Sequence, residues 1–444
     1  MDIYSISKLT SLKSYYSAWG NFPQQFGELF TCKTLKEIKI FLLQKKPFIP
    51  VGNLKSYGDS ALSDRMMKFD PPKTIRINSN KRIASVSANV SIGDLIKKSI
   101  PLGLFPAVVP GTKFVTIGGA IASDIHGKNH HIDGCFSDHL LSFEIITPNG
   151  NKVQCDREKT PGLWKTTCGG MGLTGVITSA KLKLKKVNSS MIDQKTIKAD
   201  SIEKLFHLFE KNNQDPYSVA WLDCTAKNEN LGRGIFLSGK FSDNILNKPL
   251  TIHLHPNFSI PFLMPKYLIN RFTVKVFNFI YYAFSQYSQS ERQIHYDKFF
   301  FPLDRVKNWN RIYGGSGFLQ YQFVLPKSSS LDGLRSILST INNSGEDSPL
   351  AVLKLFGKQN GNYLSFPMEG YTLALDFKNT PKVHQLLSKL DEIVKNNNGR
   401  IYLAKDSRVN KRNLSSGYQK FEIFKNQFIN QKVFSSLQSQ RLFH

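Results

Sequence analysis

The chain has 444 residues, which is too long for one ordinary hydrophobic core and therefore predicts two domains. Its 41% apolar and 21% charged residues are typical of a globular protein and exclude a disordered one. A net charge of +26 favours a polyanionic partner, which could be nucleic acid, an anionic bilayer or a phosphorylated substrate.

The five cysteines are scattered along the chain without a CxxC pair. This spacing argues against a zinc ribbon and against a disulfide framework, so a reducing compartment is the default expectation. The N-terminus lacks the apolar core of a signal peptide, and no run of 18 apolar residues predicts a transmembrane helix. The segment Ile260–Ser288 mixes aromatic residues with three cations, and an interfacial membrane helix and a buried helix pair explain it equally well.

The first 185 residues alternate short strands and helices around conspicuous loops. Thr34 and Ser91 are residue types that cap helix N-termini, and each precedes a segment with helical spacing of apolar residues. The dipeptide Asn149–Gly150 sits between two short apolar runs, as in a β-hairpin. The expected elements are helices at Thr34–Gln44 and Ser91–Ser99, strands at Pro47–Val51, Lys81–Val90 and Gly175–Val187, and a hairpin of His139–Thr147 with Lys152–Cys155.

From about Asn188 the segments become longer and richer in aromatic residues and lysine. Strands then alternate with helices, which suggests a sheet covered on one face by helices. The expected strands are Thr251–His255, Gly317–Pro326, Leu350–Phe356 and Tyr371–Phe377, and the expected helices are Ser330–Asn342 and Lys382–Asn396.

Three glycine-rich loops stand out in the first part of the chain: SYGDS (Ser56–Ser60), PGTKFVTIGGA (Pro110–Ala120) and GGMGLTG (Gly169–Gly175). Such loops expose backbone N–H groups that suit a pyrophosphate. Any one of them could be a simple tight turn, but three together indicate a large, extended cofactor. The third loop matches GxGxxG, yet a strand follows it where a dinucleotide-binding fingerprint needs a helix, so the Rossmann fold is excluded.

The loop Gly118–His131 (GGAIASDIHGKNHH) offers histidines beside the second glycine cluster. His126 and His130 are four residues apart, as on a zinc-binding helix, but Gly127 lies between them and no acidic or thiol cluster supports a site. Metal binding is therefore the minor alternative and no metal is expected. Nucleic acid is not expected as a partner either, because the lysines form no basic tract and no reader motif is present.

These loops resemble those of FAD-dependent oxidoreductases of the vanillyl-alcohol-oxidase (PCMH) type, and within that family the enzymes acting on polyprenyl-phosphate-linked ribose. The likeness continues in order through Trp309–Pro326, Leu353–Gly357, Leu364–Tyr371 and Ile401–Arg408 (IYLAKDSR). It implies an α+β fold in which a two-part FAD-binding domain (1–185 and 399–444) carries an inserted substrate domain (186–398). The inserted domain is expected to have an antiparallel sheet covered by helices.

The resemblance also implies a reaction, namely oxidation of a sugar hydroxyl to a ketone by hydride transfer to flavin N5. The implied substrate is a phosphate-linked pentose, including a polyprenyl-phosphate-linked one, and a short-chain dehydrogenase would complete an epimerisation in cell-wall polysaccharide synthesis. An anionic membrane surface is a further implied partner, with a location in the cytoplasm or at the periphery of the inner membrane. The alternatives are a soluble aldonolactone or alditol oxidase that uses oxygen and a redox-silent FAD-binding scaffold.

Site residues follow from matching the family motifs position by position. Lys405 and His126 are the implied catalytic residues, and Tyr57 stands where relatives attach FAD to a histidine, so noncovalent FAD is expected. His130 and His131 are expected to be structural and to hydrogen-bond their own loop. The implied substrate-binding residues are Lys128, Trp221, Gln320, Gln322, Lys354 and Phe356, and the implied FAD-binding residues are Gly52, Asn53, Lys55, Ser56, Tyr57, Gly58, Asp59, Gly111, Thr112, Thr116, Gly118, Gly119, Ala120, Ser123, Ile125, Gly172, Gly175, Ile177 and Tyr402.

The chain departs from the family pattern at several of these places. Leu54 and Lys55 replace a usual glycine and arginine, and Phe300 replaces a tyrosine of close relatives. Thr372 and Ala374 also replace residues that line the relatives' pocket. Lys354 lies in an apolar strand pattern where an unpaired charge would be costly, so a phosphate or carboxylate partner is expected for it.

Overall fold

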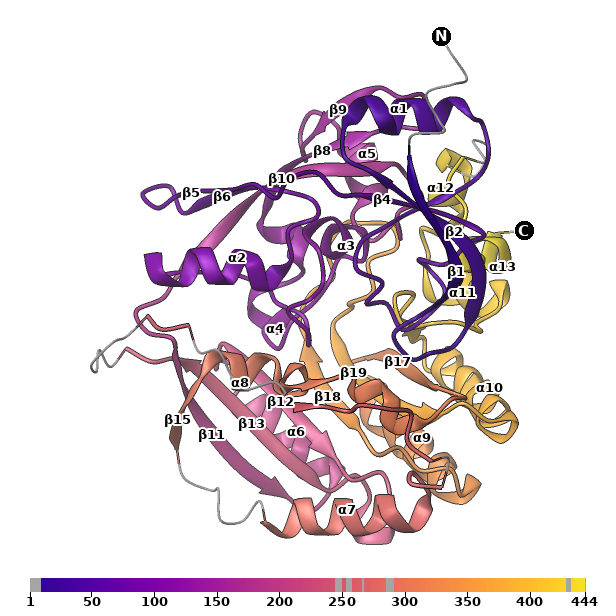
Figure 1. Cartoon of the computed structure of the whole chain (residues 1–444). Coiled ribbons are helices and arrows are strands. Elements are labelled where there is room, and N and C mark those ends of the chain that lie inside the picture. The colour runs from indigo at the N-terminus through magenta and orange to yellow at the C-terminus, as the bar shows by residue number, and fades with distance from the viewer. Residues whose placement is uncertain are drawn as a thin grey trace.

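The structure is a computed structural model that describes residues 9–243, 250–252, 258–265, 267–284, 291–428 and 433–443. Two lobes meet along the middle of the molecule (Figure 1). The upper lobe in this view contains two small sheets and the C-terminal helices, and the lower lobe contains one large antiparallel sheet. This arrangement confirms the predicted α+β fold.

The first small sheet has four strands in the order β1-β2-β4-β3. Helix α1 (Leu35–Leu43) follows its second strand, and Thr34 begins the helix with a capping box that includes Glu37. The helix and the third strand were predicted, whereas the first two strands were not. The strands are β1 (Thr10–Ser17), β2 (Gln24–Cys32), β3 (Ile49–Val51) and β4 (Arg65–Phe69).

The second small sheet is antiparallel and has the central order β5-β6-β10-β8-β9, with β7 paired to β10. Ser91 caps α2 (Ile92–Ser99) as predicted, and β8 with β9 forms the expected hairpin. The strands are β5 (Ile75–Asn78), β6 (Ile83–Ser87), β7 (Leu104–Pro106), β8 (Leu140–Ile146), β9 (Lys152–Cys155) and β10 (Val176–Lys186). Short helices lie between them: η2 (Ile100–Leu102), α3 (Ile117–Ala122), α4 (His130–Asp133), η3 (Phe136–His139) and α5 (Pro161–Thr167).

The large sheet has eight strands in the order β15-β11-β13-β12-β18-β19-β17-β20. Helices α6 (Ile202–Lys211), α9 (Ser330–Ser344) and α10 (Pro381–Asn396) cover one of its faces and share a core with it, which confirms the predicted architecture. The strands are β11 (Met191–Ala199), β12 (Tyr217–Leu222), β13 (Gly234–Phe241), β15 (Arg292–His295), β17 (Phe318–Pro326), β18 (Ala351–Phe356), β19 (Gly370–Lys378) and β20 (Arg400–Ile401).

Smaller elements lie in the connections between the strands of this sheet. They are η4 (Asn228–Asn230), the strand pair β14 (Phe258–Ser259) and β16 (Val306–Lys307), α8 (Tyr296–Phe300), η6 (Pro302–Arg305) and η7 (Trp309–Tyr313). Of the expected strand Thr251–His255, the first two residues are not in a strand and the rest lie outside the described residues.

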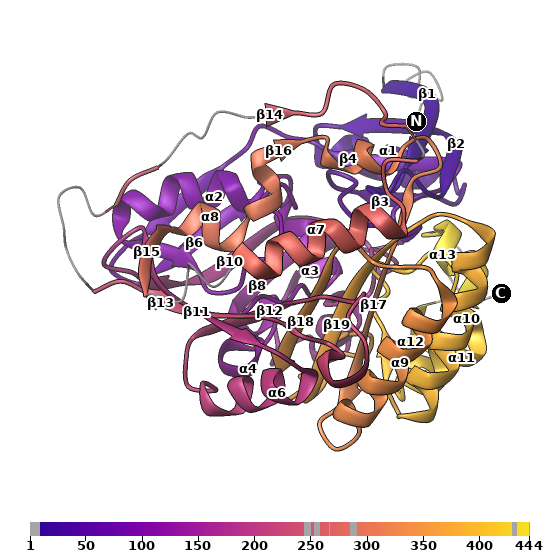
Figure 2. The ribbon, with the colours of Figure 1, turned by 90° about the horizontal axis from the view of Figure 1, so that it is seen from below.

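Helix α7 (Arg271–Phe284) is a single helix on the outside of the molecule, in front of the large sheet in Figure 2. Only Val274 and Asn278 of its side chains are buried. The interpretation of this segment as a buried helix pair is therefore wrong for the residues that the structure describes. In these residues, no helix combines the length and the apolar character needed to cross a bilayer.

After β20 the chain returns to the upper lobe through α11 (Lys411–Gly417), α12 (Phe421–Phe428) and α13 (Leu437–Phe443). Phe434 forms a parallel bridge with Phe48, and the Leu437 N–H donates to the Leu62 carbonyl at 2.8 Å. The two ends of the chain therefore pack together, and the middle of the chain forms the large sheet.

Candidate active site

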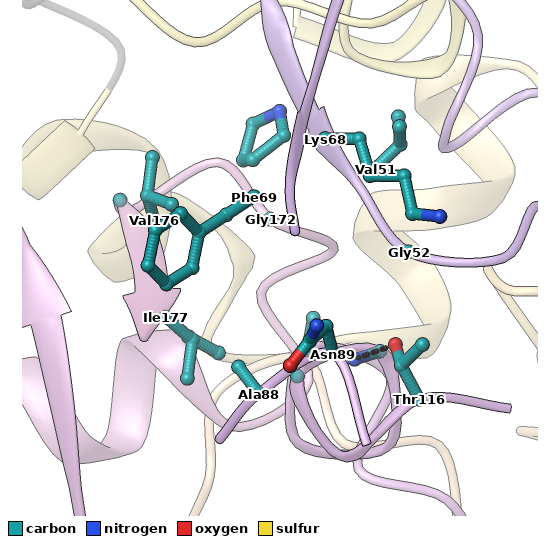
Figure 3. A pocket seen from close by; sticks show the side chains of 15 residues that line it. Val51, Gly52, Lys68, Phe69, Ala88, Asn89, Thr116, Gly172, Val176 and Ile177 are labelled. Carbon is teal, nitrogen blue, oxygen red and sulfur yellow. Dashed lines mark hydrogen bonds between the residues drawn. The ribbon is translucent and has the colours of Figure 1, made fainter. Parts of the chain in front are cut away.

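The second and third glycine-rich loops line one open cavity together with Pro50, Val51 and Gly52, which precede the first loop. Figure 3 shows Phe69, Val176 and Ile177 on one side of the cavity and Gly52 with Thr116 on the other. Seven of the predicted FAD-binding residues line it: Gly52, Thr116, Gly118, Gly119, Gly172, Gly175 and Ile177. Residues that sequence reasoning missed complete the lining: Pro50, Val51, Lys68, Phe69, Ala88, Asn89, Ala122 and Val176.

The cavity has the chemistry that FAD needs. Its lining includes Lys68 but no aspartate or glutamate, which favours an anionic pyrophosphate. Asn89 donates its amide to Asp70 and to the Pro71 carbonyl, while its buried Oδ1 has no partner and is free to accept from a ligand. At Gly175, where φ is +155°, a Cβ would lie 2.5 Å from the Ile146 carbonyl oxygen, so this loop requires glycine.

The first glycine loop (Ser56–Ser60) packs against the segment AKDSR (Ala404–Arg408). Tyr57 N–H donates to the Ala404 carbonyl at 3.1 Å, and a Cβ on Gly58 would lie 1.7 Å from the Asp406 carbonyl oxygen. Arg441 of α13 bridges the carboxylates of Asp59 and Asp406 at 2.8 and 2.9 Å. Burial raises the pKa of Asp59 to about 6 against the lowering effect of Arg441.

Lys405 lies at the centre of a second cluster, where the two lobes meet. Its Nζ is 3.6 Å from the centroid of the Tyr57 ring, a cation–π geometry. Burial lowers the pKa of Lys405 to about 7, and the carboxylate of Asp376 partly opposes this shift. The lysine is therefore a mixture of amine and ammonium near neutral pH.

Asp376 is a site residue that sequence reasoning missed. It is fully buried, and burial raises its pKa to about 7. Gln320 donates its amide to Asp376 Oδ1 at 2.6 Å, and the Tyr313 hydroxyl donates to Oδ2 at 3.4 Å. The only local signal was an acidic residue in the apolar segment YTLALDF, the same signal that identified Lys354 in its own strand.

His126 is buried among aromatic rings next to this cluster. Its ring centroid is 4.7 Å from that of Phe356 and 5.5 Å from that of Tyr402. Gln322 places its amide nitrogen 3.1 Å from His126 Nε2. Burial, followed by the charge of Lys354, holds the pKa of His126 well below its usual value, so the imidazole is neutral.

Two further lysines, Lys128 and Lys354, are enclosed near His126. Burial lowers the pKa of Lys354 to about 8, and burial together with Lys354 lowers that of Lys128 to about 7. The Lys128 ammonium donates to the Phe299 carbonyl. Among the described residues, no carboxylate pairs with Lys354 within ion-pair distance. An anion in this space would stabilise both ammonium groups.

The strand register explains why the predicted substrate-binding residues share one face. Directly opposed residues of antiparallel strands project to the same side of a sheet. Gln322 lies opposite Ala374, Ala374 opposite Val352, and Val352 opposite Trp221, so these four form one row across the sheet. In the adjacent row, Lys354 lies opposite Thr372, which shares the row of Val324.

The other predicted FAD-binding residues lie outside the cavity lining. Tyr57 and Tyr402 belong to the Lys405–His126 cluster, and the Tyr402 hydroxyl donates to the Ser123 carbonyl at 3.2 Å. Lys55 places its Nζ 3.8 Å from the Trp19 ring centroid. The remaining residues are Asn53, Ser56, Gly58, Asp59, Gly111, Thr112, Ala120 and Ile125.

His130 and His131 are structural, as predicted, but their hydrogen-bond partners lie outside their own loop. His130 Nδ1 accepts from the Gly357 N–H at 3.2 Å, and His131 Nε2 lies 3.0 Å from the Asp215 carbonyl oxygen. Both rings thus connect their loop to the large lobe instead of stabilising the loop itself. Asp124 also bonds outside the loop: it is fully buried and accepts from the Ser137 N–H and from the Ser365 hydroxyl.

Comparison with known proteins agrees with this geometry. An FAD binding domain model matches residues 34–156. Decaprenylphosphoryl-β-D-ribose oxidase of Mycolicibacterium smegmatis is 35% identical over 384 residues, which is 83% of this chain and 82% of that protein. An uncharacterized protein of Streptomyces coelicolor is 29% identical over 76% of this chain and 94% of its own length. Cytokinin dehydrogenase 2 of Arabidopsis thaliana is 28% identical over 24% of this chain and 22% of its own length.

The first of these matches spans both lobes, and the domain match covers the first and second glycine-rich loops. The chain therefore belongs to the vanillyl-alcohol-oxidase-type family of FAD-dependent oxidoreductases, to which decaprenylphosphoryl-β-D-ribose oxidase also belongs, and FAD is its cofactor.

Proposed function

We propose that this enzyme oxidises one hydroxyl of a phosphate-linked pentose, carried on a polyprenyl lipid, to a ketone. The observation that carries the proposal is the pair of enclosed ammonium groups of Lys354 and Lys128 beside His126. Enclosed cations without a protein carboxylate are costly, and a substrate phosphate would offset that cost. The named substrate of the 35% identical relative is a phosphate-linked ribose of this kind.

The oxidation removes a proton from the hydroxyl and a hydride from its carbon. FAD, when bound, supplies the hydride acceptor. Lys405 in its amine form accepts the hydroxyl proton, because its pKa of about 7 leaves a large neutral fraction at neutral pH. Asp376 then stabilises the resulting ammonium, since its charge favours the protonated lysine.

Other side chains of the same space orient the sugar. The neutral His126 imidazole is oriented by the Gln322 amide of the opposite lobe, and the Gln320 amide is oriented by Asp376. Phe356 packs against His126 and excludes water from it. A preorganised set of this kind positions one hydroxyl for transfer without reorganisation in each turnover.

The ketone product is the first half of an epimerisation, and we propose a short-chain dehydrogenase as the enzyme that reduces it to the epimeric alcohol. FAD is held noncovalently, because Tyr57 rather than a histidine occupies the first loop at the position used for attachment. Acid precipitation should release the yellow colour into the supernatant. Colour retained in the pellet would show a covalent bond and contradict this part of the proposal.

The phosphate assignment is tested by Lys354→Met, with the exposed Lys358→Met as the matched control. Loss of a charge-assisted hydrogen bond of about 1.5–3 kcal/mol predicts a rise in KM for a phosphopentose of roughly 10- to 100-fold. The control should leave KM unchanged. An unchanged KM in Lys354→Met would show that the phosphate binds elsewhere.

A further inference from the structure

The outer side of the segment 258–284 carries an unusual concentration of exposed apolar side chains. Twelve of the large apolar side chains that are exposed among the described residues lie in this segment. We call them the α7 surface. The six largest contributors are each between 63% and 78% exposed: Phe258, Phe262, Tyr267, Phe272, Phe279 and Phe284.

Helix α7 is firmly attached through its polar side, which is the reverse of an ordinary surface helix. Asn278 is fully buried and donates to Asp223 Oδ1 at 2.8 Å, and the Tyr282 hydroxyl donates to the Ala199 carbonyl at 3.1 Å. Arg271 pairs with Asp347 at 3.4 Å. These contacts fix the orientation in which the phenylalanine rings of α7 face outward. An exposed apolar patch of this extent marks an interaction surface.

The charge of the segment selects the kind of partner. The sequence has no aspartate or glutamate between Asp243 and Glu291, while Lys248, Lys266, Arg271 and Lys275 lie in that interval. The whole chain carries a net charge of +26. Aromatic side chains next to cations, without acidic residues, complement the headgroup layer of an anionic bilayer. A helix of 14 residues can lie in that layer but cannot cross it.

The α7 surface is also connected to the substrate face of the large sheet. Trp221 lies in the same row as Gln322, three strand spacings away, or about 14 Å. The ring of Tyr281, from α7, packs edge-on against Trp221 with a centroid distance of 4.8 Å. The helix therefore stands at the border of the face that carries Gln320, Gln322 and Lys354.

We infer that the α7 surface docks on an anionic bilayer and holds the substrate face of the large sheet next to the membrane that supplies the lipid-linked sugar. This inference rests on the proposed function for the identity of the substrate. Docking fixes the protein in one orientation, so that the polyprenyl chain remains in the lipid while the phosphate and the sugar reach Lys354 and His126.

The test uses the full-length holoenzyme and sedimentation with vesicles of phosphatidylcholine alone or with 30% phosphatidylglycerol. The variant is Phe272→Gln with Phe279→Gln, which keeps helix propensity. The matched control is Tyr15→Thr with Phe26→Thr, a pair of exposed rings 5.3 Å apart on β1 and β2. We expect the wild type and the control to bind the anionic vesicles, and the α7 variant to lose at least about tenfold in partition coefficient.

Two results would overturn the inference. One is equal vesicle binding by the α7 variant and the wild type, or no binding by either at low salt. The other is self-association of the wild type without vesicles that the α7 variant abolishes, because a second copy would then cover the surface. Turnover of a short-chain, water-soluble phosphopentose separates the two proposals. The α7 variant should retain this turnover. If no protein, wild type included, turns the compound over, the proposed function is contradicted, while the vesicle-binding result can still be interpreted.

Discussion

Lys405 and Asp376 form an interacting pair at the point where the lobes meet. Each has a pKa shifted to about 7 by burial, and the negative charge of Asp376 raises the pKa of Lys405. The amine form of Lys405, which accepts the proton in our proposal, becomes populated as the pH rises through about 7. The rate of flavin reduction should therefore rise with pH across that value.

Asp376→Asn tests the origin of this pH dependence. Removal of the carboxylate removes the influence that raises the pKa of Lys405, so the acid limb of the kcat/KM profile should move to lower pH. Tyr313→Phe is the control, because it removes one hydrogen bond to Asp376 but no charge. An acid limb that stays in place in Asp376→Asn would show that another group controls it.

Lys405→Met should retain bound FAD, because Lys405 is not among the residues that line the glycine-loop cavity. Loss of a general base predicts a fall in the rate of flavin reduction of roughly 10²- to 10⁴-fold. Rapid-mixing absorbance under anaerobic conditions measures this rate. A variant that reduces its flavin at the wild-type rate would remove Lys405 from the chemical step.

At the residue scale, the sequence predicted those side chains whose neighbours along the chain indicate burial. Lys405 follows an apolar run and Lys354 interrupts one, so burial of both could be inferred. Asp376 was missed because its hydrogen-bond partners Gln320 and Tyr313 are 56 and 63 residues away, and no local pattern connects them. The contacts of His130 and His131 were mispredicted for the same reason.

At the scale of elements, the contact between the first glycine loop and the AKDSR segment sets the geometry of the site. Gly58→Ala would force its Cβ against the Asp406 backbone, whereas Gly111→Ala meets no atom within 4 Å. We expect Gly58→Ala to weaken FAD binding by at least about tenfold, since separating the segments displaces the neighbouring Gly52, which lines the cavity. Flavin fluorescence titration measures this, and equal FAD affinity in the two variants would contradict the close packing.

Helices with strong caps were predictable, and elements that depend on distant partners were not. Thr34 and Ser91 begin α1 and α2 as expected, because a cap is a local interaction. Strands β1 and β2 were missed because β1 is largely exposed, β2 is largely half-buried, and neither shows clear alternation of apolar and polar residues. For α7 the sequence left a membrane interface and burial equally open, and the structure shows a helix that is held through Asn278 with its apolar side facing outward.

At the scale of the whole molecule, the C-terminal helix α13 closes the FAD-binding lobe through Arg441. This residue lies between two buried carboxylates, so its removal leaves them uncompensated. Arg441→Met should lower the free energy of unfolding by about 3 kcal/mol, as measured by urea denaturation of the holoenzyme. The exposed Arg412→Met is the control, and equal stability of the two variants would show that the bridge contributes little.

The order of the lobes along the chain could be expected only from the resemblance to known oxidoreductases, because no local signal shows that residues near both termini pack together. The contacts of Phe48 with Phe434 and of Asp59 with Arg441 join positions almost 400 residues apart. Composition, by contrast, indicated a polyanionic partner without naming one. The arrangement of side chains is what distinguishes the two proposed anionic partners, a substrate phosphate at Lys354 and a membrane surface at α7.

The most direct test of the account is an anaerobic titration of the holoenzyme with a polyprenylphosphoryl ribose, followed through the visible absorbance of the flavin. The proposed oxidation predicts that one equivalent of the phosphopentose bleaches the flavin and that a keto-sugar is released. It also predicts much slower bleaching by the corresponding sugar without phosphate. Equal bleaching by aldonolactones or alditols, or none by any phosphopentose, would contradict the account.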